Sequence, residues 1–252
     1  MRQLWFLDLE RAPVYQVWAG DYDVFIAWAW DSNSRFTYVQ DLQTGLIRID
    51  ADAASGGEVI YEGDENLEVG GVLDGRLLIG RFNPGGDLWR VDENDLAGAN
   101  SIEDVGSLLV PLEGSEGFPS LSPDQRWLSY SSNATGRTEV YVLAYPVEEA
   151  PRPLRLSTDG GEEAVWSPRG DGLYFRDARR WYWVPLTDSE QQPFGEPELF
   201  AEGEYLNLPG LEYAVSADGS RLLVVRSVGE PTTTTLNVIT NFFEVLEERV
   251  PN

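Results

Sequence analysis

Carboxylates are the side chains of this sequence that could do chemistry, because the chain contains no His and no Cys. Without these residue types there is no Ser-His-Asp triad, no thiolate nucleophile and no ordinary zinc site. Acidic residues recur just before a strand-like run in several successive parts of the chain. They are Asp23, Glu68, Glu116, Glu162, Glu163 and Glu212.

Three interpretations of these carboxylates are open. If the runs that follow them surround one channel, the carboxylates could form a ring that binds an Arg or a cation, with Ca²⁺ as the candidate metal because it prefers oxygen ligands. Two separated carboxyl groups could instead hydrolyse a glycosidic bond. The third interpretation is a solvated rim without a function. No pattern marks a general acid among them, so we predict no catalytic residue.

Serine is the other candidate nucleophile, and it recurs in the triplets Ser-Pro-Asp, Ser-Pro-Arg and Ser-Ala-Asp at residues 122–124, 167–169 and 216–218. Each triplet occupies the same place between two strand-like runs, where Ser and Asp typically shape a turn. No base is available to activate a serine. We therefore interpret the triplets as turn residues.

The elements that would position these side chains are short strands in a repeat. The turn residues Gly75, Gln125, Gly170 and Gly219 are separated by 50, 45 and 49 residues. A period of roughly 40–50 residues with about four strands per unit is typical of a β-propeller. The fold class is therefore all-β, a propeller of four-stranded antiparallel blades. Such blades bury their faces only by stacking on one another.

Dividing the chain by strands gives a single propeller domain over residues 1–252, followed at its end by a short helix at about 242–249. Asn241 and Glu244 could cap this helix. Two strands at the beginning could complete the last blade, which would give five blades. The blade segments are about 2–19, 21–63, 65–108, 113–159, 161–204 and 208–241.

The charge of the chain limits its partners. Its formal net charge is −25, and all its cationic side chains are Arg. This surface repels phosphate backbones and anionic membranes, so we expect no nucleic-acid partner. We see no signal peptide and no run long enough to span a membrane. We expect a monomer whose partner is a protein or a small molecule.

Several stretches resemble a known family. "PSLSPDQRWLSYSSNATGRTEVYVLAYP", "LRLSTDGGEEAVWSPRGDGLYFRD", "YAVSADGSRLLVV" and "TLNVITNFFEVL" are similar to TolB-like propeller repeats. More closely, they resemble the C-terminal propeller of many bacterial transmembrane serine/threonine protein kinases. The resemblance is strong over residues 115–246 and weaker over residues 2–110.

This resemblance implies six blades, an extracytoplasmic setting and a sensing or protein-interaction role without catalytic residues. The chain departs from the family because it begins within the first blade and has no glycine-rich loop, no Lys and no His-Arg-Asp loop of a kinase. We therefore expect a non-catalytic scaffold for protein or ligand binding, which could be a detached or truncated sensor domain of a kinase-type receptor. The alternatives are a carboxylate-dependent, glycosidase-like hydrolase and an isolated domain with no independent role.

Overall fold

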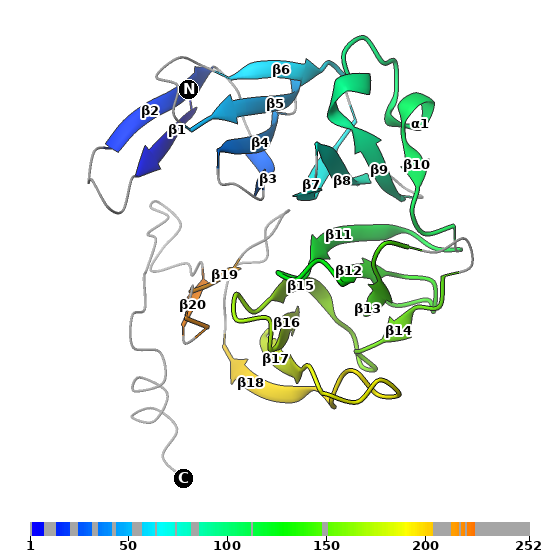
Figure 1. Cartoon of the computed structure of the whole chain (residues 1–252). Coiled ribbons are helices and arrows are strands. Elements are labelled where there is room, and N and C mark those ends of the chain that lie inside the picture. The colour runs from blue at the N-terminus through cyan, green and yellow to red at the C-terminus, as the bar shows by residue number, and fades with distance from the viewer. Residues whose placement is uncertain are drawn as a thin grey trace. The chain divides into compact units, whose positions relative to one another are not determined.

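The computed structural model consists of short strands and little helix in the part of the chain that it describes (Figure 1). Asp23, Glu212 and the predicted helix at 242–249 lie outside that part. None of the described helices is long and apolar enough to cross a membrane. The described residues are 2–7, 14–20, 25–31, 35–41, 44–51, 57–63, 65–73, 75–81, 86–111, 113–147, 151–203, 213–216, 218–219 and 221–224.

The predicted four-stranded antiparallel sheets are confirmed. In each sheet, strands that follow one another in sequence lie side by side (Figure 1). The four-stranded sheets have the orders β3-β4-β5-β6, β10-β9-β8-β7, β11-β12-β13-β14 and β15-β16-β17-β18, and two-stranded sheets are formed by β1-β2 and β19-β20.

The first strands of the sheets have the following bounds: β1 Arg2–Leu7, β3 Phe25–Trp30, β7 Leu67–Leu73, β11 Glu116–Leu121, β15 Glu162–Trp166 and β19 Tyr213–Val215. The second strands are β2 Val14–Gly20, β4 Phe36–Asp41, β8 Arg76–Arg81, β12 Trp127–Ser132, β16 Gly172–Asp177 and β20 Leu222–Val224. The third and fourth strands are β5 Gly45–Asp50, β6 Glu58–Tyr61, β9 Leu88–Asp92, β10 Ser107–Leu108, β13 Glu139–Ala144, β14 Leu154–Arg155, β17 Arg180–Pro185 and β18 Glu198–Glu202. A 3-10 turn η1 (Glu93–Asp95) and a short helix α1 (Ile102–Val105) follow β9.

The serine triplets build turns, as the sequence predicts. The hydroxyl of Ser122 accepts from the backbone N–H of Trp127 at 3.0 Å and donates to Asp124 at 2.6 Å. The hydroxyl of Ser216 accepts from Arg221 N at 2.9 Å in the equivalent turn. The recurring turn residues Gly75, Gln125, Gly170 and Gly219 have φ values of 72°, 58°, 71° and 65°. These turns therefore require the left-handed backbone conformation that Gly tolerates best.

The first strands carry a second recurring feature, an irregularity in pairing. The register with the next strand shifts between Phe25 and Trp28 in β3, between Val69 and Gly71 in β7, and between Glu162 and Val165 in β15. In each case the first strand has one residue more than its partner, which defines a β-bulge. Glu163 lies in one of these bulges with a φ of 54°.

The chain divides into two compact units, Met1–Ser120 with Ser132–Gly136 and Leu121–Ser131 with Arg137–Asn252. In the first unit, Tyr38 and Leu46 of one sheet share a buried cluster with Leu77 and Ile79 of another. In the second unit, neighbouring sheets share clusters in the same way. Each core thus forms between the faces of two sheets, as the stacking argument requires.

Candidate functional site

The structure describes four of the predicted carboxylates. The sequence predicts that they lie just before the first strand of a sheet, and all four lie within such a strand. Glu68 is in β7, Glu116 begins β11, and Glu162 and Glu163 begin β15. Glu68, Glu116 and Glu163 are buried, with exposed fractions of 6%, 2% and 2%. The interpretation as a solvated rim is therefore wrong for these three side chains.

The carboxylate of Glu163 forms a bidentate ion pair with Arg176 of β16. Nε and one terminal nitrogen of Arg176 lie 2.9 and 2.7 Å from the two carboxylate oxygens. Only 1% of the Arg176 side chain is exposed, and Glu162 approaches the same guanidinium to 3.7 Å. A bidentate pair supplies the strong hydrogen bonds that a buried charge needs.

The backbone of Glu163 is bound as well. The hydroxyl of Tyr213 donates to the carbonyl oxygen of Glu163 at 2.5 Å. Burial raises the pKa of Tyr213 well above its ordinary value, so this hydroxyl remains a donor. The side chain of Glu163 thus joins β15 to β16 through Arg176, and its backbone carbonyl joins β15 to β19 through Tyr213.

The carboxylate of Glu68 has a similar structural contact in the first unit. It accepts a hydrogen bond from the backbone N–H of Phe118 at 2.9 Å. Phe118 lies in β11 with a φ of 52°, and Glu68, Phe118 and Glu163 each lie seven residues before the turn residue of their own sheet. Glu116 is therefore two residues away from the repeated position that Glu68 and Glu163 occupy.

The carboxyl group of Glu116 has a different environment. One oxygen, Oε1, accepts from the hydroxyl of Ser132 at 2.8 Å. The other, Oε2, is buried and has no hydrogen-bond partner among the described residues. Burial raises the pKa of Glu116, the hydroxyl of Ser132 lowers it, the negative charge of Asp87 raises it, and the net shift is upward. Among the described residues, this buried carboxyl group is therefore bound by one hydroxyl and by no cation.

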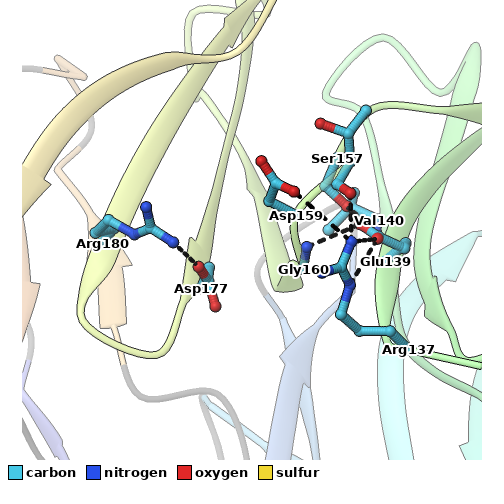
Figure 2. A network of polar contacts seen from close by, with 9 residues as sticks. Arg137, Glu139, Val140, Ser157, Asp159, Gly160, Asp177 and Arg180 are labelled. Atoms are coloured by element: carbon cyan, nitrogen blue, oxygen red, sulfur yellow. Dashed lines mark hydrogen bonds and ion pairs between the residues drawn. The ribbon is translucent and has the colours of Figure 1, made fainter.

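A further buried carboxylate, Glu139 of β13, was missed by the sequence analysis. Figure 2 shows it surrounded by donors from two segments of the second unit. It accepts from Nε and a terminal nitrogen of Arg137 at 3.1 and 2.9 Å, from the hydroxyl of Ser157, and from Gly160 N at 3.2 Å. Arg137 in turn is 54% exposed. The pattern Arg-Thr-Glu before a strand was the available signal, but the contributions of Ser157 and Gly160 come from distant residues.

A second ion pair in Figure 2 joins Asp177 to Arg180, at the two ends of the tight turn between β16 and β17. Among the described residues, no three or more Asp or Glu side chains lie close enough together to hold a metal ion. Glu163 is instead bound by Arg176, Glu68 by the backbone N–H of Phe118 and Glu116 by the hydroxyl of Ser132. The prediction of a ring that also contains Asp23 and Glu212 remains a prediction.

No family model matches the chain, and no curated protein matches it either. Solved structures do match its fold. TolB from Acinetobacter baumannii has a TM-score of 0.61 at 14% identity, with 90% of this chain and 54% of the TolB chain covered. A chain of the nidogen/laminin complex also has a TM-score of 0.61, at 15% identity, with 87% and 80% covered. A periplasmic gluconolactonase from Pseudomonas aeruginosa has a TM-score of 0.56, at 15% identity, with 89% and 69% covered.

These similarities define the class of protein. The four-stranded antiparallel sheets and the matched structures together place the chain among β-propellers, and TolB is one of the proteins it is similar to. The chain spans about half the length of the matched TolB chain, 54%. The matched structures range from a chain of the nidogen/laminin complex to a gluconolactonase, so the fold leaves the activity open.

Proposed function

We propose that this chain is a non-catalytic propeller scaffold that binds a protein partner through an extended basic segment. The strand β18 carries the proposal. It is the last strand of its sheet, and Leu199 within it is 58% exposed, the largest exposed fraction among the apolar side chains described as exposed. An edge strand offers unpaired backbone groups to another extended chain.

The charges around this edge select the partner. Glu196, Glu198 and Glu202 are all exposed and lie beside or within β18. Like charges disfavour the addition of a second copy of this acidic chain, whereas Arg or Lys side chains on a partner strand would be attracted. An apolar residue of the partner would cover Leu199. This arrangement combines backbone pairing for affinity with charge for selectivity.

The buried carboxylates support a scaffold over an enzyme. Glu163, Glu68 and Glu139 are each used to join strands through an Arg, a backbone N–H or a hydroxyl. A hydrolase instead needs a pair of carboxyl groups that face a substrate. The resemblance to kinase-associated propellers supports the finer proposal of an extracytoplasmic sensor domain.

One observation favours the alternative of a hydrolase. Glu116 has a raised pKa, which is the property that a general acid requires. The matched gluconolactonase shows that enzymes occur among structures with this fold. Turnover of a lactone, lost on Glu116→Gln, would support this alternative and count against the scaffold.

The binding proposal is tested by biolayer interferometry with two synthetic peptides, one of alternating Arg and Val and one with Glu in place of Arg. We expect saturable binding of the basic peptide only. Glu198→Gln combined with Glu202→Gln should weaken it at least about fivefold, on the scale of a few tenths to one kcal/mol for each exposed charge pair.

The matched control for this test is Asp95→Asn combined with Glu113→Gln, which removes the same charge from two exposed positions far from β18 in sequence. This pair should leave the affinity within twofold. Equal weakening by both pairs would mean that only the net charge attracts the peptide, and the β18 proposal would be rejected. Hydrogen exchange of β18 provides a second readout, because a paired edge must exchange more slowly.

A further inference from the structure

The edge strand β18 contains a β-bulge that fixes its register with β17. Tyr182 of β17 is opposite Leu199, whereas the residue before Tyr182 is opposite Ala201. Phe200 is therefore the extra residue of β18. Its ring packs edge-on against the ring of the buried Tyr174, with 5.2 Å between the two centroids. This contact holds the bulge in place, so the side chains on either side of it have defined positions.

The bulge brings Leu199 and Glu202 to the same face of the sheet. Directly opposite side chains share a face, and so do residues two apart on a regular strand. Leu199 is opposite Tyr182. Glu202 is opposite Arg180, whose guanidinium lies over the ring of Tyr182 at 5.7 Å from its centroid. Glu198, the neighbour of Leu199, therefore lies on the other face.

A row of apolar side chains crosses the first of these faces and ends at Leu199. Phe175 of β16 is opposite Tyr182 of β17, and their rings stack with 5.0 Å between centroids and 16° between planes. Leu199 continues this row at the edge of the sheet, where it is 58% exposed. An aromatic or aliphatic side chain on an added strand would cover Leu199, and cross-strand pairs of this kind stabilise a sheet.

Two carboxylates define where cations should lie on an added strand. Glu198 and Glu202 are both exposed, one on each face. Opposite charges directly across two strands stabilise the pair, and like charges destabilise it. On the inner side of β18, Arg180 already lies opposite Glu202. A partner that supplies its own cations from the outer side would repeat this pairing.

We propose that the segment bound by β18 is an antiparallel strand with the motif Arg-x-Φ-Arg, where Φ is aromatic or large and aliphatic and x is any residue. Along the partner, the first Arg lies opposite Glu202, Φ opposite Leu199 and the second Arg opposite Glu198. One residue separates the first Arg from Φ, because a regular strand returns to the same face after two steps, whereas β18 needs three across its bulge. This inference rests on the proposed function, which it refines by naming the sequence of the partner.

The motif is tested by biolayer interferometry of the full chain with two peptides of identical composition. Their central segments are Thr-Arg-Thr-Tyr-Arg-Thr and Arg-Thr-Thr-Tyr-Arg-Thr, and the second moves the first Arg away from Glu202. The first peptide should bind about threefold tighter or more, because one cross-strand charge pair distinguishes the two. Glu202→Gln should remove this preference. The matched control Glu196→Gln, at an exposed position just before β18, should retain it.

The outcomes separate this motif from the proposed function. Equal affinities for the two peptides, or a preference that Glu202→Gln retains, would overturn the motif and leave the proposed function in place. Failure of both peptides while the alternating Arg-Val peptide binds would do the same. If no basic peptide binds, the proposed function is rejected and the motif with it.

Disulfide trapping provides a second readout of the register, because the chain has no Cys of its own. Leu199→Cys introduces one thiol, and Cys in place of Tyr in the first peptide should lie opposite it. Directly opposite residues of antiparallel strands have Cα atoms about 4.5–5.5 Å apart, a separation that a disulfide spans. With oxidised glutathione, this pair should cross-link about fivefold faster or more than with Cys one position earlier in the peptide.

The control for the trapping experiment is Leu223→Cys, at an exposed position of β20 in a different sheet. It should give the background rate of cross-linking with either peptide. Equal rates for the two Cys positions in the peptide, or an equal rate for Leu223→Cys, would overturn the proposed register.

Discussion

Two first strands of this protein bury a glutamate to the same extent, and the two glutamates are held differently. Glu163 in β15 and Glu116 in β11 are both 2% exposed. The former is paired with Arg176 on the second strand of its sheet, whereas among the described residues the latter is bound by the hydroxyl of Ser132 on the second strand of its own sheet. The two glutamates therefore differ in the partner that the second strand supplies, a guanidinium for Glu163 and a hydroxyl for Glu116, and not in how deeply they are buried.

The largest effect should come from removing the partner of Glu163. Arg176→Met leaves a buried carboxylate unpaired and should lower the free energy of unfolding by about 3–5 kcal/mol. Urea denaturation measures this loss. Adding Glu163→Gln to the variant removes the stranded charge and should restore most of the stability. A loss below about 1 kcal/mol for Arg176→Met alone would show that the ion pair is not what compensates the buried charge of Glu163.

A smaller loss is expected at Glu139, whose Arg137 partner is largely in solvent. Glu139→Gln should cost about 2 kcal/mol, because the charge-assisted bonds from Ser157 and Gly160 are weakened together with the ion pair. Arg137→Gln should cost less than about 1 kcal/mol, as is usual for exposed pairs. Thermal unfolding of the two variants tests this ranking, and the reverse order would contradict it.

The opposite sign is expected at Glu116. Its pKa in the folded state is raised, so the folded state favours the proton, and this stability is present below the unfolded pKa and lost as the pH rises through the folded pKa. Glu116→Gln removes that loss and should stabilise the protein at pH 7 by about 1 kcal/mol. Free energies of unfolding at pH 4 and pH 7 should differ less in the variant. A variant with an unchanged pH dependence would show that Glu116 is ionised without penalty.

The smallest effect concerns the turns that precede the second strands. Gln125 has a φ of 58° where the equivalent Gly170 has 71°. Gln125→Gly removes backbone strain but increases the entropy of the unfolded chain, so a net gain of about 0.5 kcal/mol or less is expected. Chemical denaturation can resolve this difference against Gly170→Ala, which should destabilise the protein by about 1 kcal/mol.

The sheets were predictable because turn chemistry and strand alternation are local. Ser122 and Gly170 mark their turns within a few residues, and the spacing of such turns indicates the repeat. The contacts of the carboxylates were not predictable in the same way. Glu163 and Arg176 meet across a bulge, and two of the donors to Glu139, Ser157 and Gly160, lie 18 and 21 positions away. Neither interaction follows from the alternation of apolar and polar residues.

The register of Glu116 could have been read from the sequence. Counting back from Gln125 by the interval that separates Glu163 from Gly170 arrives at Phe118, so Glu116 does not belong to the repeated position. What the count could not provide is the burial of Glu116 or the missing partner of its Oε2. Those depend on Ser132 and Gly114, which the fold brings to the same carboxyl group.

The bulges in β3, β7 and β15 have a consequence for which side chains these strands can bury. Side chains alternate between the faces of a strand, and one extra residue reverses that alternation. In β3, β7 and β15, the alternation of side chains between the two faces is therefore reversed from one side of the bulge to the other. One strand can therefore bury a carboxylate such as Glu68 or Glu163 near its beginning and an apolar side chain such as Val72 or Trp166 after the bulge.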